Sequence, residues 1–176
     1  NVEYYAKGPW SNYIDRQKGS FLGRYVTTVD DMFEPLPHPQ TNGDRQGLRE
    51  LILGNNTTGD TLKIETEGQV SFSLSHYDET KYSTYQLHPW DLTRLNPTYA
   101  HFDYMQRGIG NGSCGPGTID NYKIPSTGTF SYKLRFTPKK KITTDGISET
   151  KQKSDHVIYY DRAKQHIICN GSFDKS

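Results

Sequence analysis

Short runs of alternating apolar and polar residues recur along the chain, with turn-forming residues between them. In residues 130–136, two Phe, one Tyr and one Leu alternate with polar or charged side chains, which predicts a strand with one buried face. Strands are expected at residues 2–6, 21–29, 48–53, 62–65, 70–74, 100–105, 130–136, 156–160 and 166–169. Many short strands separated by turns predict an all-β chain that forms an antiparallel β-sandwich.

The last part of the chain has a different composition. Residues 139–155 contain a lysine run, few apolar side chains and no periodicity, which predicts a charged linker or the tip of a hairpin. Residues 156–176 carry two apolar runs around a polar turn, the pattern of a C-terminal β-hairpin. We therefore expect a sandwich domain at residues 1–138, followed by these two segments. Within that domain, residues 78–85 allow one or two helical turns.

Two loops interrupt the strand pattern. Residues 34–43 hold three prolines and an Asn-Gly pair, so they cannot form a central strand. Residues 107–117 hold five glycines and one proline, and we expect an irregular loop at the rim of a sheet. A phosphate cradle needs a helix directly after the glycines, and Pro116 and Gly117 begin none. We interpret this second loop as a connection that can shape a pocket.

Charge and composition exclude several classes of protein. The 176 residues carry a net charge of +1, from 21 basic and 20 acidic side chains, so nucleic acid is not an expected partner. No apolar run approaches the roughly 20 residues that span a bilayer, so we expect no membrane segment. The six histidines show no spacing that would bring two rings to one metal ion. Whether Cys114 pairs with Cys169 is left open.

Several separated motifs, in a fixed order, resemble a known family. The run Gly-Pro-Trp-Ser-Asn-Tyr-Ile-Asp-Arg at residues 8–16 and the run Phe-Asp-Tyr-Met-Gln-Arg-Gly-Ile-Gly at residues 102–110 are the longest of them. The others lie at residues 2–6, 23–25, 39–43, 48–51, 70–77 and 113–117. Together they resemble the C-terminal small-chain domain of glycoside hydrolase family 2 β-galactosidases, over about residues 1–138. Several motifs in the right order are far more specific than any one of them.

The resemblance carries expectations about the fold. It implies a galactose-mutarotase-like supersandwich, of which this chain would hold only the later strands. A chain that starts in a strand pattern at Asn1 also looks like a piece of a longer protein. An incomplete sandwich exposes a strand edge, so we expect instability or self-association of the isolated chain, including a homo-oligomer.

The resemblance also carries expectations about function. It implies a non-catalytic domain of an enzyme that hydrolyses terminal β-galactosides, with the rest of that chain and its catalytic barrel as partner. Retaining glycoside hydrolysis needs two carboxyl groups about 5 Å apart. The acidic pairs Asp30-Asp31 and Asp78-Glu79 do not supply them, because neighbouring residues of a strand point to opposite faces. In the family, both catalytic glutamates and the magnesium ligands lie on the barrel. No cofactor is expected on this chain, while magnesium is implied for the whole enzyme, with sodium left open as a second ion. Bacterial cytoplasm and periplasm both stay open as compartments.

The resemblance assigns the glycine-rich loop to the mouth of that barrel. Candidate residues for the substrate rim are Gly110, Asn111, Ser113, Cys114, Trp10, Asn12 and His101. The family has a tryptophan after the loop serine as a platform for the sugar, and this sequence has Cys114 there, which puts the stacking role in doubt. For residues 10–16 a purely structural interpretation is favoured over sugar contact, with Trp10 and Tyr13 as packing residues and Asp15-Arg16 as an ion pair.

Two other classes of function remain. One is a stand-alone carbohydrate-binding module, or a small subunit that completes a separate catalytic chain. The other is a mutarotase-like enzyme, which needs an acid and a base beside the sugar ring. This class ranks last, because the sequence offers His101 no evident glutamate partner. A fold alone does not decide between these classes.

Overall fold

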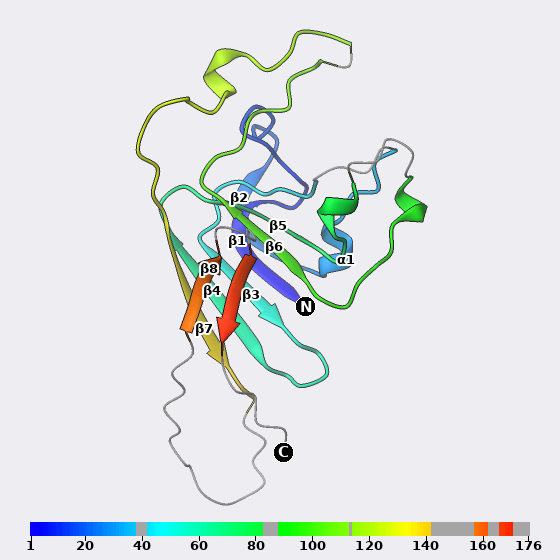
Figure 1. The fold of residues 1–176 in the computed structure, drawn as a ribbon, viewed down its shortest axis with the longest axis vertical. Coiled ribbons are helices and arrows are strands. Elements are labelled where there is room, and N and C mark those ends of the chain that lie inside the picture. The colour runs from blue at the N-terminus through cyan, green and yellow to red at the C-terminus, as the bar shows by residue number, and fades with distance from the viewer. Residues whose placement is uncertain (38–41, 83–87, 113, 142–156, 162–165, 171–176) are drawn as a thin grey trace, which may run out of the picture. The chain divides into compact units, whose positions relative to one another are not determined.

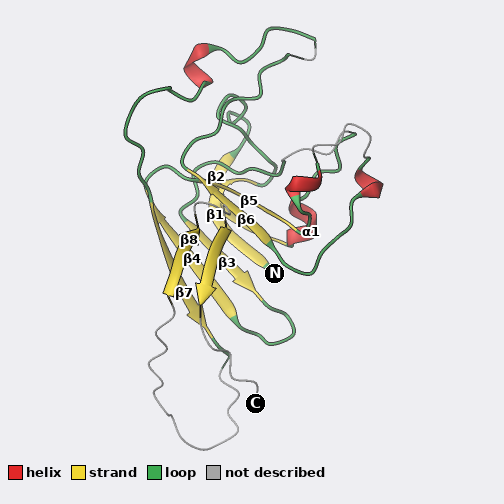
Figure 2. Cartoon of the chain, viewed as in Figure 1, coloured by secondary structure: helices red, strands yellow, loops and turns green. Residues whose placement is uncertain are grey.

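The computed structural model describes residues 1–37, 42–82, 88–112, 114–141, 157–161 and 166–170. The chain divides into two compact units, residues 1–141 and residues 142–176. Antiparallel strands dominate the described residues and helix is almost absent, which confirms the predicted all-β class (Figures 1 and 2). Ser113 and most of the predicted linker at 139–155 lie outside the described residues.

The first unit contains two sheets. The larger has five antiparallel strands in the order β2-β1-β3-β4-β7. These strands are β1 (Val2–Gly8), β2 (Phe21–Thr27), β3 (Glu50–Gly54), β4 (Thr61–Glu67) and β7 (Lys133–Lys139). The smaller sheet pairs β5 (Ser71–Ser75) with β6 (Tyr99–Asp103). The helical elements are α1 (Val29–Met32) and the single 3-10 turns η1 (Glu79–Lys81), η2 (Pro89–Asp91) and η3 (Asp120–Tyr122).

The hydrophobic core joins the two sheets. Alternation along β1 buries Val2, Tyr4 and Ala6 on one face, as period-two patterning requires. Phe72 of β5 packs against Tyr4 with ring centroids 5.3 Å apart, in a tilted, nearly edge-on arrangement. Leu51 of β3 and Ile64 of β4 are part of the same buried cluster, which makes this unit a two-layered β-sandwich.

Predicted strand boundaries shift by one or more residues in several places, and two of the shifts have an evident local cause. The strand expected at residues 21–29 ends at Thr27, because the Thr28 side chain accepts a hydrogen bond from Asp31 N (3.1 Å) and caps helix α1. The strand expected at residues 130–136 begins only at Lys133 and continues to Lys139. Residues 130–132 precede it without ladder pairing, and their aromatic rings line a pocket instead.

The second unit contains β8 (Val157–Asp161) and β9 (His166–Asn170), which pair antiparallel where the sequence predicts a hairpin. Only the backbone of these strands is described. Within the described part of the chain, no helix has the length and apolar character needed to cross a bilayer.

Candidate functional site

The glycine loop, residues 107–117, follows β6 and closes on itself through backbone hydrogen bonds. Asn111 N donates to Pro116 O (3.0 Å), and Gly115 N donates to Asn111 O (2.6 Å). At the base of the loop, Gly108 N donates to Tyr122 O (2.8 Å). These bonds replace the ladder that a strand would supply, so the loop has a defined shape without regular secondary structure.

Two of the glycines are required by this shape. A Cβ atom on Gly108 would lie 2.7 Å from Cγ of Asp15 and 2.9 Å from Cβ of Tyr122. Gly110 has a φ of +68°, and a Cβ there would lie 2.5 Å from the backbone N of Thr118. The glycine run therefore permits close approach to other parts of the chain, as the sequence indicated.

Asp15, which is not part of the glycine loop, binds it through two hydrogen bonds. Its Oδ2 accepts a hydrogen bond from Gly110 N (2.8 Å), and its Oδ1 accepts one from Ile109 N (3.1 Å). Desolvation acts to raise the pKa of this carboxyl, but the backbone hydrogen bonds from Gly110 and Ile109 outweigh it and keep the pKa below its usual range. Asp15 is therefore ionised and accepts from both loop amides.

Arg16 holds the same loop through a second set of contacts. Its Nη2 donates to the carbonyl O of Gly110 (2.6 Å) and to Oδ1 of Asn111 (2.8 Å). We call Asp15 and Arg16 together the clamp. The two residues are adjacent in sequence and lie more than ninety positions from the loop that they bind. Both side chains engage the glycine loop, whereas the sequence suggested an ion pair or a direct sugar contact.

A hollow of about 390 Å³ lies between the clamp and the glycine loop. It is lined by Asp15, Arg16, Gly110, Asn111, Pro116, Gly117, Ile119 and Tyr122. The lining combines ionised and amide groups with an aromatic ring and an isoleucine. This mixture suits a ligand that presents both hydroxyl groups and apolar faces.

Asn12 fixes the segment that leads into the clamp. Its side chain is 1% exposed, and its Nδ2 donates to the carbonyl O atoms of Lys7 and Trp10 (3.0 Å each). Its Oδ1 accepts from Gln46 N (3.0 Å). All of these partners are backbone groups, so within this chain Asn12 positions the backbone before the clamp. As a substrate-rim residue it stays a prediction.

Gln46 belongs to a buried strap, residues 42–48, which pairs with β5 through Arg45 and Phe72. The strap carries Asp44, whose backbone O accepts from Asn12 N (2.7 Å) and whose Oδ2 accepts from Gln46 Nε2 (2.5 Å). Burial raises the pKa of Asp44 to about 7, and the nearby carboxylate of Asp103 acts in the same direction. The strap therefore contains a buried carboxyl group that titrates near neutral pH.

The remaining rim candidates lie at different places. Trp10 is 77% exposed and lies just before the clamp in the sequence, and Cys114 is exposed on the glycine loop. His101 lies on β6, with Nε2 3.4 Å from Oε1 of Glu79. The expectation that His101 lacks a glutamate partner is therefore wrong, because η1 brings Glu79 to it from twenty-two positions away. Ser113 is outside the described residues.

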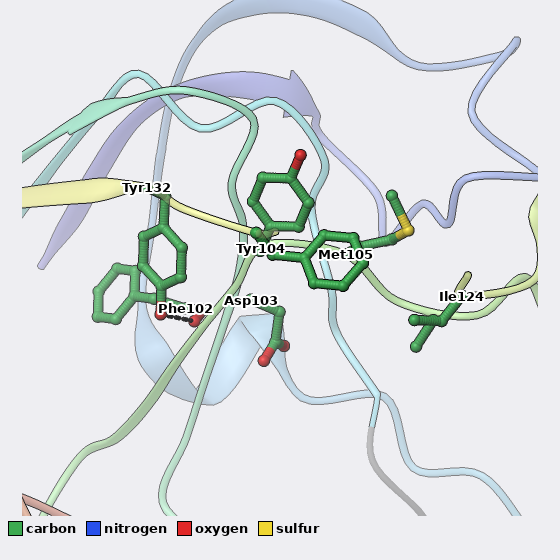
Figure 3. Close-up of a pocket in the computed structure, with 7 residues that line it drawn as sticks. Phe102, Asp103, Tyr104, Met105, Ile124 and Tyr132 are labelled. Atoms are coloured by element: carbon green, nitrogen blue, oxygen red, sulfur yellow. Dashed lines mark hydrogen bonds between the residues drawn. The ribbon is translucent and has the colours of Figure 1, made fainter. Parts of the chain in front are cut away.

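A second, aromatic pocket of about 220 Å³ lies beside the start of the glycine loop (Figure 3). It is lined by Phe102, Asp103, Tyr104, Met105, Ile124, Phe130 and Tyr132. Figure 3 shows Tyr132 beside Phe102, whose carbonyl O accepts from its hydroxyl (3.0 Å), with Met105 and Ile124 at the other end of the pocket. This lining offers sugar hydroxyls fewer polar partners than the clamp hollow does.

Comparison with known proteins identifies the family. The model of the family described as beta galactosidase small chain matches residues 1–136. The chain belongs to the β-galactosidase small-chain family. The match ends within β7, so β8 and β9 lie beyond it. The resemblance found in the sequence motifs is thereby confirmed.

Individual relatives agree with this small-chain assignment. A β-galactosidase of Staphylococcus xylosus is 32% identical over 136 residues, which cover 77% of this chain and 13% of the relative. β-Galactosidases of Actinobacillus pleuropneumoniae and Vibrio cholerae are 30% and 32% identical over 135 and 133 residues, or 77% and 76% of this chain and 12% of each relative. The small-chain match thus spans only about an eighth of the length of these relatives.

Sequence reasoning missed how the small-chain domain uses its residues 15 and 16. The pair was noticed as part of the motif at residues 8–16, but nothing in the linear sequence links that motif to the glycine loop. One signal could have linked them. Two family motifs occur together: one contains an Asp-Arg pair, and the other is a glycine-rich loop whose backbone amides need hydrogen-bond acceptors from elsewhere. The aromatic pocket was also missed, because residues 130–132 were assigned to a strand.

Proposed function

We propose that this chain is the C-terminal part of a longer β-galactosidase that hydrolyses terminal β-galactosides. The small-chain domain is a non-catalytic part of that enzyme, which supports its structure and supplies a loop to the rim of the active site. The observation that carries the proposal is the family match over residues 1–136 together with the small share of each relative that it covers. The catalytic barrel of the same protein is then the main partner of this domain. Galactoside is the substrate.

The glycine loop is the part of this domain that we assign to the substrate rim. Support comes from the clamp, which fixes a loop that would otherwise be among the most mobile parts of the chain. Gly110, Asn111 and Cys114 are presented by this loop, and Trp10 is exposed just before the clamp. A loop held by two charged side chains can present groups to a sugar with little entropy lost on binding.

Chemistry at the glycosidic bond is assigned to the remainder of the enzyme. Among the described residues, no three His, Cys, Asp or Glu side chains gather closely enough to hold a metal ion. The magnesium implied by the family is assigned to the catalytic barrel. The domain shapes the rim of the substrate site, contacts the sugar there and excludes water from it.

Expression of the complete gene tests this proposal. We expect the reading frame upstream of Asn1 to encode a barrel with two catalytic glutamates, and the product to hydrolyse nitrophenyl β-galactoside. The 176-residue chain alone should show no hydrolysis in the same assay. A complete gene product that begins close to Asn1, or one without β-galactosidase activity, would overturn the proposal in favour of a separate sugar-binding module or subunit.

A mutarotase-like activity is the second candidate, since the structure pairs His101 with Glu79. An acid and a base side by side are what sugar ring opening needs. Polarimetry on fresh α-galactose, with the 176-residue chain and with His101→Gln, separates this candidate from the first. Equal rates of mutarotation with both proteins would exclude it.

A further inference from the structure

The same dipeptide, Asn-Gly, occurs in two different environments of the small-chain domain. Asn111-Gly112 lies on the glycine loop, and Asn42-Gly43 begins the buried strap. An asparagine followed by glycine can lose its side-chain amide without an enzyme, because glycine has no Cβ to obstruct attack by its own backbone nitrogen. That nitrogen and the side-chain carbonyl carbon must first come together. Local structure therefore decides which of the two pairs reacts.

The pair in the strap is held on every side. Asn42 is buried, its Oδ1 accepts from Glu34 N (3.0 Å), and its Nδ2 donates to the carbonyl O of Glu34 (3.0 Å). Gly43 has a φ of +76°, and a Cβ there would lie 2.5 Å from the carbonyl O of Met32. Neither the side chain nor the following peptide unit can turn without breaking these contacts.

The pair on the glycine loop has far more room. Both of its residues are exposed, and no atom lies within 4 Å of the Cβ position of Gly112. Among the described residues, Gly112 N donates no hydrogen bond. The restraints act on Asn111, whose carbonyl O accepts from Gly115 N (2.6 Å) and whose Oδ1 accepts from Nη2 of Arg16 (2.8 Å). Each of these two bonds involves a group that must rotate before the attack.

We propose that Asn111 is a site of spontaneous deamidation, and that Arg16 slows the reaction by holding the side-chain amide in place. The backbone nitrogen of Gly112 forms a bond to Cγ of Asn111, the bond from Cγ to Nδ2 breaks, and the proton of Gly112 N leaves with Nδ2 as ammonia. Water then opens the cyclic succinimide at either carbonyl carbon, which gives aspartate or isoaspartate. The reaction is a hydrolysis without electron transfer, and it does not depend on the proposed function.

Deamidation would change the surface between the clamp and the glycine loop. Asp15 and Asn111 line the same hollow, so the product places a second carboxylate in it, and the hydrogen bond from Arg16 becomes an ion pair. Isoaspartate also inserts Cβ into the backbone. The bond between the carbonyl O of Asn111 and Gly115 N then no longer fits, and the loop loses its shape.

Peptide mapping of the 176-residue chain tests the site. The chain is kept at mildly alkaline pH, and mass spectrometry of timed digests measures conversion at each asparagine, with a parallel sample in urea as the unfolded reference. We expect Asn111 to react at least about tenfold faster than Asn42 in the folded chain, and the two to react at similar rates in urea. A rate at Asn111 no higher than that at Asn42 in the folded chain would overturn the proposal.

The variant Gly112→Ala is the matched test of the attacking group. The space around Gly112 accepts a methyl group, so the fold is retained, while the added Cβ obstructs the attack. We expect conversion at Asn111 to fall about tenfold and conversion at Asn42 to stay as it is. Unchanged conversion at Asn111 would show that Gly112 N is not the nucleophile.

The restraint by Arg16 is tested with Arg16→Met, which keeps the apolar stem and removes every donor. We expect conversion at Asn111 to rise about fivefold, because one hydrogen bond to the reacting amide is lost. Lys123→Met is the control for lost charge, since Lys123 pairs with Asp120 (2.6 Å). A rate for Arg16→Met equal to or below that of Lys123→Met would overturn the assigned role of Arg16.

Discussion

The carboxylate of Asp15 accepts a hydrogen bond from the backbone N–H of Gly110, at 2.8 Å and across ninety-five positions of sequence. A second bond from Ile109 N makes this a two-point attachment. Backbone amides in an irregular loop have no ladder partner, so a fixed carboxylate is an effective way to order them. The glycine loop thereby becomes a defined surface of the small-chain domain.

Removal of this carboxylate should loosen the loop. For Asp15→Ala we expect amide hydrogen exchange at Ile109 and Gly110 to accelerate about tenfold, because each amide loses a charge-assisted acceptor. Asp120→Ala is the control, since the Asp120 side chain is 92% exposed and its partner among the described residues is nearby Lys123. Exchange measured by NMR or mass spectrometry that is equally slow in both variants would show that Asp15 is not what orders the loop.

The two loop glycines at positions 110 and 112 should respond differently to the same substitution. Gly110→Ala places a Cβ 2.5 Å from Thr118 N at a φ of +68°, so we expect a loss of about 1 to 3 kcal/mol in unfolding free energy. Gly112 has no atom within 4 Å of its Cβ position, and Gly112→Ala should change stability by less than about 0.5 kcal/mol. Urea denaturation of the two variants measures the difference, and similar values would contradict the described loop geometry.

Asp44 should make stability depend on pH. Its folded pKa of about 7 lies above the ordinary value of 3.8, so the folded state binds the extra proton and stability is highest below pH 4 as far as this group is concerned. As the pH rises from about 4 to about 7 this contribution falls, by at most about 4 to 5 kcal/mol at about 1.4 kcal/mol for each pKa unit. Above pH 7 the loss is complete.

The variant Asp44→Asn isolates this effect. An amide of the same shape still accepts from Gln46 Nε2, and it cannot ionise. We expect Asp44→Asn to be more stable than the wild-type chain at pH 7.5 and to lose the decline between pH 4 and 7 in denaturation curves. A decline that persists unchanged would assign it to other groups.

The open edge of the larger sheet is expected to cause self-association. Among the described strands β2 pairs with β1 alone, and it carries Phe21 and Val26, which are 74% and 75% exposed. The opposite edge, β7, carries Pro138 and terminal lysines, which discourage strand addition. Val26→Lys should therefore reduce concentration-dependent association in sedimentation velocity experiments, while Thr137→Lys on β7 should not. Equal association of both variants would exclude β2 as the contact edge.

The strands were predictable because period-two alternation is a local property of the sequence. β1, β3, β4 and β5 lie close to their expected residues, since each buries alternate side chains and ends at turn-forming residues. Residues 28 and 29 were misassigned because a hydroxyl cap decided between helix and strand, and such a cap depends on one hydrogen bond.

The sequence by itself determined that the chain is all-β, that residues 107–117 form an irregular glycine loop, and that its motifs follow those of the β-galactosidase small chain. Each of these rests on composition, short-range periodicity or the order of motifs along one dimension. Only the tertiary structure decided that Asp15 and Arg16 bind that loop and that Glu79 lies beside His101. Contacts between residues far apart in the chain depend on how the sheets and loops pack in three dimensions. Such contacts produce no periodic pattern along the sequence, so only the tertiary structure reveals them.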